Sequence, residues 1–267
     1  MLILLSLIPA LAQQAAADQG CVPIGLSDLV QVEAPAVIVL GESQGETDDL
    51  RRAAQVVRAL RDRDRVTLAL QAVHEDETRN LDALSAAVPN LDKVAEAVGW
   101  QEHWPWPTEG YRPLLALGLA DSPGGVDLIA IGPNDAPDAD ARIPVVPTGY
   151  PERLGVLSGD TLSPTMRTRL AQARTWGDSR MAERALGAWD GKGYLVVVAD
   201  RTRVAGRGGV DWQLRQRTDS PVVAAILDWS DQDCVDGTWL WSAPTLRASL
   251  PSWVAPSPNP EKAKPSN

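Results

Sequence analysis

The chain has 267 residues, of which 44% are hydrophobic and 22% are charged. This length allows one large domain or two small ones with a full hydrophobic core. Its formal net charge of −10 argues against nucleic-acid binding, because contacts to phosphates need a basic surface.

The first segment, residues 1–12, is apolar and uncharged and ends in the small-x-small pattern Ala10-Leu11-Ala12. This pattern is typical of a secretory signal peptide, and the apolar run is too short to span a membrane. We therefore expect cleavage after Ala12 and a periplasmic or secreted protein. Lipid anchoring through Cys21 is the alternative, which the polar residues before this cysteine disfavour.

The chain contains two cysteines, Cys21 and Cys234. In an exported protein an even number of cysteines predicts a disulfide. A bridge that closes so long a loop is worth about 4–5 kcal/mol in the chain-entropy model. Two unpaired thiols are the alternative.

Short apolar runs alternate with amphipathic segments along most of the chain. The runs predict buried strands at residues 35–41, 65–73, 126–132, 194–199 and 221–227. Helices are predicted at residues 46–61, 77–98, 163–189 and 209–217. This alternation predicts an α/β fold, with a mostly parallel central sheet flanked by helices. The predicted segments are a leader at 13–34, one domain at 35–249 and a disordered Pro/Ser-rich tail at 250–267.

In such folds, ligands bind beyond the carboxyl ends of the strands. Three polar segments are predicted there: GESQ at 41–44, QAVHED at 71–76 and DRTRVAGRGG at 200–209. Glu42 therefore lies where a ligand site is expected, although a helix cap is an alternative role for it.

Five motifs occur in an order that resembles a known family. They are Gly41-Glu42-Ser43-Gln44, Leu70-Gln71-Ala72, WPWPTEGYRPLL at 104–115, Asp178 with Met181-Ala182, and ADRTRVAGRGGV at 199–210. Together, over about residues 36–227, they resemble the ChaN-like, haem-binding-uptake branch of the Tiki/erythromycin-esterase superfamily. The resemblance implies the ChaN-like α/β fold and a haem or porphyrin ligand, with a role in iron uptake.

The chain departs from the family pattern at three positions. Gln44 and Arg203 replace histidines, and Gln71 replaces an acidic residue. A glutamine amide exchanges no proton, and arginine stays charged and is no base. The resemblance therefore implies that the His-based site is lost, with no catalytic residue and no metal. Glu42, the remaining carboxylate, is predicted to form a charge-assisted pair with Arg203.

A haem site needs a flat apolar surface, an axial ligand and cations for the propionates. The Trp-rich loop offers Trp106, Tyr111 and Arg112, although a core cluster of aromatic residues would give the same pattern. Tyr150, Tyr194 and the histidines are the next candidates for the axial ligand. The predicted ligand-binding residues are Glu42, Gln44, Gln71, His74, Trp106, Tyr111, Arg112 and Arg203.

The leading function is haem or porphyrin binding in the cell envelope, by a monomer or a homodimer. A metal-dependent hydrolase of the same superfamily is one alternative. A non-catalytic pseudo-enzyme that binds other proteins is another.

Overall fold

The computed structural model describes most of the predicted domain. The described residues are 22–77, 91–104, 106–119, 125–133, 144–151, 162–204, 208–227 and 239–241. The predicted signal peptide, both cysteines of the predicted disulfide and the predicted tail lie outside these residues, as does most of the helical region expected at 77–98.

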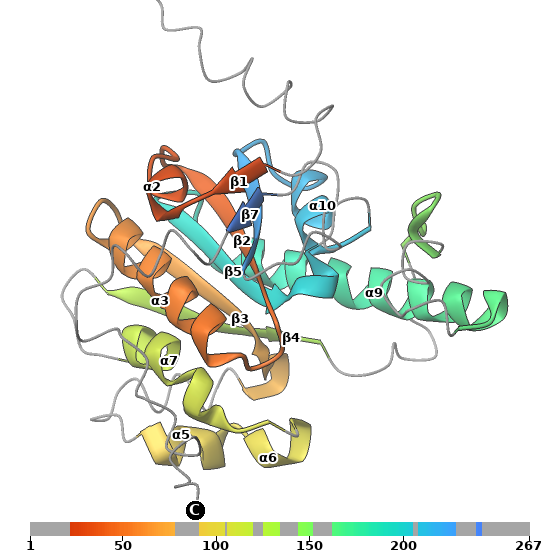
Figure 1. Ribbon diagram of the computed structural model, residues 1–267, viewed down its shortest axis with the longest axis horizontal. Coiled ribbons are helices and arrows are strands. Elements are labelled where there is room, and N and C mark those ends of the chain that lie inside the picture. Colours follow the sequence, from red (N-terminus) through yellow and green to blue (C-terminus); the bar gives the residue numbers. More distant parts are fainter. Residues whose placement is uncertain are drawn as a thin grey trace, which may run out of the picture.

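The described strands form one seven-stranded sheet in which every pair is parallel (Figure 1). The strand order is β1-β7-β6-β2-β5-β3-β4. The strands are β1 (Val22–Ile24), β2 (Ala36–Glu42), β3 (Val66–His74), β4 (Val126–Gly132), β5 (Tyr194–Asp200), β6 (Val222–Leu227) and β7 (Trp239–Trp241). All five predicted strands are present, and the predicted α/β class is confirmed.

The neighbouring strands β2 and β5 explain why apolar runs of the sequence form strands in this fold. Every residue of β2 and β5 is buried, as expected for parallel strands that are covered on both faces. Alternate β2 side chains enter different cores, because neighbouring residues of a strand point to opposite faces. Ile38 and Leu40 belong to one core, and Val37 and Val39 to the other.

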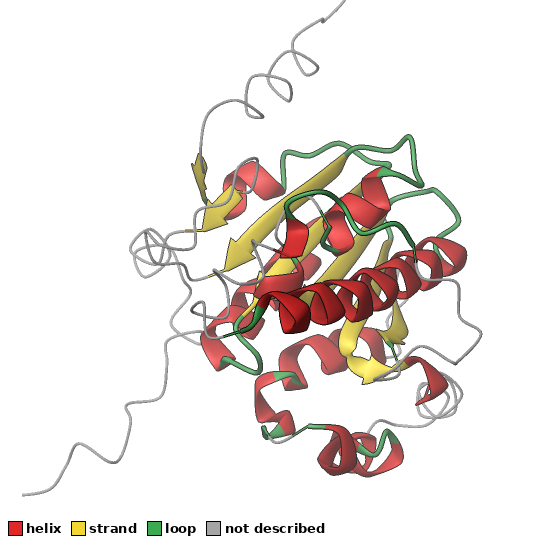
Figure 2. Cartoon of the chain, turned by 90° about the vertical axis from the view of Figure 1, so that its right-hand side faces the viewer, coloured by secondary structure: helices red, strands yellow, loops and turns green. Residues whose placement is uncertain are grey.

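Helices cover both faces of the sheet. The core that contains Ile38 also includes residues of α2 (Leu26–Leu29), α3 (Thr47–Arg61), α5 (Leu91–Ala97), α6 (Trp100–His103) and α7 (Arg112–Leu119). The other core includes residues of α9 (Pro164–Ala188) and α10 (Val210–Arg215). Figure 2 shows α9 lying across its face of the sheet. The α9 helix begins as predicted, with Ser163 Oγ accepting a hydrogen bond from the Met166 amide.

The sheet also uses residues from the segment that the sequence assigned to a leader. β1 pairs with β7, and Leu29 of α2 is fully buried in the core. Both strands are only three residues long, which is too short to produce a periodic apolar pattern. Among the described residues, no helix has the length and apolar character needed to cross a membrane.

Candidate functional site

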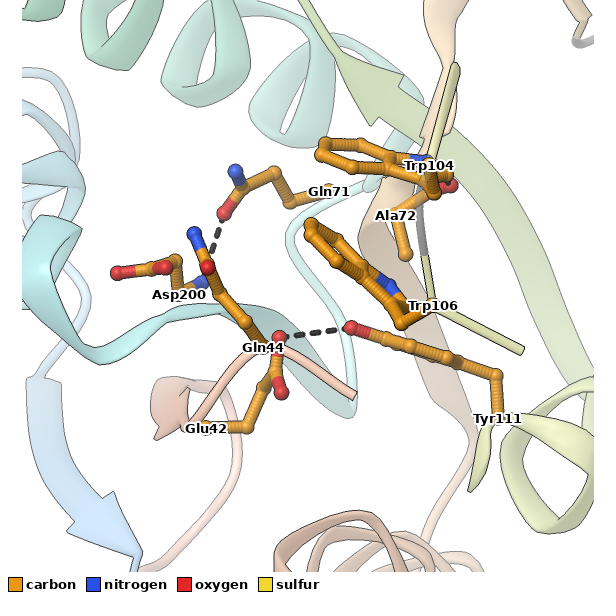
Figure 3. A pocket seen from close by; sticks show the side chains of 8 residues that line it. All are labelled: Glu42, Gln44, Gln71, Ala72, Trp104, Trp106, Tyr111 and Asp200. Carbon is orange, nitrogen blue, oxygen red and sulfur yellow. Dashed lines mark hydrogen bonds between the residues drawn. The ribbon is translucent and has the colours of Figure 1, made fainter. Parts of the chain in front are cut away.

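The carboxyl ends of three neighbouring strands surround a small cavity with room for about one water molecule (Figure 3). Glu42 is the last residue of β2, Asp200 is the last residue of β5, and the strand register makes them direct neighbours. Gln71 comes from β3. The lining residues are Glu42, Gln44, Gln71, Ala72, Trp104, Trp106, Tyr111 and Asp200.

Glu42 is held by two donors inside the cavity. The Tyr111 hydroxyl donates to Oε1 at 2.7 Å, and the Gly45 amide donates to Oε2 at 2.8 Å. Burial raises the pKa of Glu42 and the neighbouring Asp200 adds to the rise, whereas the two hydrogen bonds oppose it. Burial, together with the charge of Glu42, also raises the pKa of Tyr111, so its hydroxyl keeps its proton and acts as a donor.

The loop after β2 is tight because it bends around Trp106. Gln44 has φ +32° and Gly45 has φ +84°, in the left-handed region that side chains other than glycine rarely adopt. A Cβ atom on Gly45 would lie 2.8 Å from Cδ1 of Trp106. The loop is also held by Asp49 of α3, whose Oδ2 accepts a hydrogen bond from the Ser43 amide at 3.0 Å. Glycine at position 45 is thus needed both for its backbone angle and for this close contact.

Gln71 and Asp200 are linked across β3 and β5. The Asp200 amide donates to Gln71 Oε1 at 2.7 Å, and the Thr202 amide donates to Asp200 Oδ1 at 2.7 Å. The register of β3 with β4 shifts between Leu70 and His74, and Gln71 lies in this irregular stretch. Gln71 therefore accepts this hydrogen bond without adding a negative charge next to Asp200.

Two indole rings form the opposite wall of the cavity. The Trp104 and Trp106 rings have centroids 4.6 Å apart and are tilted by 30°. Trp104 Nε1 donates to the Ala72 carbonyl at 2.7 Å, which fixes this ring to β3. Trp106 Nε1 is buried and has no hydrogen-bond partner among the described residues.

The histidines of the chain, His74 and His103, stack on each other next to this wall. Their ring centroids are 3.9 Å apart with an interplanar angle of 18°, and His74 also contacts the edge of Trp104. His74 is buried, whereas His103 at the end of α6 is exposed. The chain thus brings together two imidazoles that are far apart in sequence.

The predicted pair of Glu42 and Arg203 is wrong. Arg203 Nη1 instead contacts Asp178 Oδ1 at 2.6 Å, and Tyr150 donates to the other oxygen of Asp178. Asp178 belongs to α9 and is fully buried. The short helix η3 (Arg201–Arg203) therefore directs this guanidinium toward α9, while Tyr111 and Gly45 each donate a hydrogen bond to Glu42.

The structure brings five of the eight predicted ligand-binding residues to the cavity: Glu42, Gln44, Gln71, Trp106 and Tyr111. His74, Arg112 and Arg203 are not among its lining residues. Asp200 and Trp104 line it but were not predicted as site residues. Asp200 directly follows the strand predicted at 194–199, so the strand-end rule used for Glu42 would also have found it.

Among the described residues, no group of three or more His, Cys, Asp or Glu side chains is placed to hold a metal ion. The chemistry available in the cavity is therefore that of two buried carboxylates, two amides, one phenol and two indoles.

Comparisons with known proteins agree with this architecture. Residues 29–136 match the family model described as haem-binding uptake, Tiki superfamily, ChaN. The fold is similar to that of ChaN of Campylobacter jejuni, in a structure described as showing cofacial haem binding, with a TM-score of 0.58 and 14% sequence identity. The similarity covers 79% of this chain and 88% of that one. No curated protein matches the sequence significantly. The predicted resemblance to the ChaN-like family is confirmed.

Proposed function

We propose that this ChaN-like protein, whose residues 29–136 match the haem-binding uptake family, binds haem outside the small cavity, on the surface formed by His103 and the neighbouring aromatic rings. The family match supports a haem-binding or haem-uptake role in general. The following contacts support a particular place for the haem.

The cavity itself does not fit haem. Its enclosed space of about 10 Å³ holds about one water molecule, far less than the roughly 300–1,000 Å³ that is usual for ligand pockets. The chain has three tyrosines, and each hydroxyl donates to an internal acceptor: Glu42, Asp178 and the Val32 carbonyl. A phenolate ligand would have to break one of these hydrogen bonds.

The stacked imidazoles are the observation that carries the proposal. Histidine is a usual haem ligand, and His103 is exposed beside His74 and Trp104. A haem held there would lie against flat rings, and Arg112 at the start of α7 is the cation that the same loop offers to the propionates. In such a complex, His103 would supply the imidazole ligand for the haem iron, and the neighbouring rings would supply the flat apolar contact.

We also infer that the protein is exported and does not hydrolyse substrates. Gln44 and Gln71 line the cavity at positions where the family pattern has a histidine and an acidic residue, and neither amide can transfer a proton. The apolar segment at 1–12 supports export. Mass measurement of the mature protein tests the expected cleavage after Ala12.

A haem titration followed by visible absorption tests the binding site. We expect saturable binding to the wild-type protein, binding about tenfold weaker in His103→Ala, and an unchanged spectrum in Tyr111→Phe. Wild-type affinity and spectrum in His103→Ala would overturn the proposed site, and an altered spectrum in Tyr111→Phe would place the haem at the phenol instead.

A further inference from the structure

The cavity at the strand ends combines negative charge with aromatic walls. Glu42 and Asp200 are only 4% and 6% exposed, and none of the described lining residues is basic. The nearby Arg203 is attracted to Asp200, but its guanidinium is bonded to Asp178. Two adjacent buried carboxylates without a cation between them are costly, because each is partly removed from water.

The carboxylates keep unused acceptor capacity. Among the hydrogen bonds of the described residues, those to the Asp200 side chain both reach Oδ1, from the amide and hydroxyl of Thr202. Its other oxygen, Oδ2, accepts none of them. Each oxygen of Glu42 accepts one hydrogen bond, although a carboxylate oxygen can accept two. The lining thus presents one carboxylate oxygen, Asp200 Oδ2, that accepts no hydrogen bond from the described residues.

The indoles favour an organic cation over a hydrated metal ion. Figure 3 shows Trp104 and Trp106 on one side of the cavity, with Gln44 and Asp200 on the other. The electron-rich face of an indole attracts ammonium groups, whereas hard metal ions need about six oxygen ligands. The hydrogen bonds of Trp104 to Ala72 and of Trp100 Nε1 to the Trp106 carbonyl at 2.8 Å hold this wall in place.

We propose that the cavity binds a small organic cation, a primary or methylated ammonium group, between the Glu42 and Asp200 carboxylates and the indoles of Trp104 and Trp106. This site shares Trp104 with the proposed haem surface, but its carboxylates are not part of that surface, and the proposal does not depend on haem binding. The enclosed space of about 10 Å³ holds about one water-sized group, which is the size of an ammonium head. Larger amines would insert only their ammonium end.

Binding is expected to depend on pH. Burial and Asp200 raise the pKa of Glu42 in the free protein, and a bound cation favours the ionised carboxylate. Affinity therefore increases as pH rises through the pKa of Glu42, and cation binding releases a proton. Asp200, Glu42 and Tyr111 are the titratable groups of the cavity lining.

Isothermal titration of the full chain with methylammonium chloride tests the proposal, with sodium chloride at equal ionic strength as the blank. We expect saturable binding at pH 8, weaker binding at pH 5, and a loss of about tenfold or more in Asp200→Asn and in Trp104→Leu. Asp127→Asn removes the same charge from an exposed position in β4 and is expected to bind like the wild type.

Asparagine keeps an Oδ1 acceptor for Thr202, so Asp200→Asn should fold, and circular dichroism checks this. If Asp200→Asn does not fold, the affinity of Trp104→Leu for methylammonium is compared with that of the wild type instead. No saturable methylammonium binding at pH 8, or wild-type affinity in folded Asp200→Asn or Trp104→Leu, would overturn the proposal. Binding of calcium or manganese chloride in place of methylammonium would also overturn it.

Discussion

Tyr111 donates a hydrogen bond of 2.7 Å to Glu42, although the two residues are 69 positions apart in the sequence. The bond joins the Trp-rich loop to the end of the central strand β2. Because both partners are buried, it fixes the loop over the cavity and engages the phenol as a donor to Glu42.

Replacing Tyr111 by phenylalanine should destabilise the fold. The change removes a buried donor from a carboxylate, and we expect a loss of about 1–3 kcal/mol in the free energy of unfolding at pH 7. Urea denaturation measures it. Tyr194→Phe is the control, because that hydroxyl donates to the neutral Val32 carbonyl and its loss should cost less. A smaller effect at Tyr111 than at Tyr194 would contradict the account.

Glu42 should make the stability of the protein depend on pH. Its pKa is raised from 4.5 by burial and by Asp200, so between the unfolded and folded pKa values the native state holds more protons than the unfolded state. The contribution of Glu42 to stability therefore falls as pH rises above about 4.5 and then levels off. In Glu42→Gln this fall should disappear, as measured by urea denaturation from pH 4 to 8. An unchanged pH slope in the variant would show that Glu42 is not responsible.

Much of this architecture could be predicted from the sequence, because strands that are buried on both faces form continuous apolar runs. The same rule placed Glu42 and Gln71 at the carboxyl edge of the sheet, where they line the cavity. The pairing of Glu42 could not be predicted, since its partner lies on a loop whose position depends on how Gly45 packs against Trp106. The partner of Arg203 is Asp178, which lies inside α9. The buried face of this helix carries Thr175 and Ser179 as well as apolar residues, so the apolar pattern of the sequence did not indicate that Asp178 is buried.

Glycine at position 45 should be required for the shape of the site. Gly45→Ala places a methyl group at a φ of +84° and 2.8 Å from Trp106, and we expect a cost of more than about 1 kcal/mol and a displaced indole. Gly191→Ala is the matched control, because Gly191 has φ +77° and no atom within 4 Å of the added Cβ. Thermal unfolding compares the two variants. Equal losses would mean that backbone strain alone, and not the contact with Trp106, explains the effect.

Arg203→Ala should leave Asp178 buried without its ionic partner. The side chain of Asp178 is 0% exposed and that of Arg203 is 19% exposed, so we expect a loss of about 3–5 kcal/mol in the free energy of unfolding. The double variant with Asp178→Asn should recover part of this loss, because the remaining side chain is neutral. A loss below about 1 kcal/mol in the single variant would show that the pair is not a structural element.

The proposed haem surface makes a direct prediction about the iron ligand. Resonance Raman spectroscopy of the ferric haem complex of the wild-type protein distinguishes a phenolate ligand from an imidazole, because phenolate gives its own vibrational bands. We expect no phenolate bands and an iron centre with imidazole ligation from His103. Phenolate bands would contradict the account, since they would require one of the three internally bonded tyrosines to leave its acceptor and bind the iron.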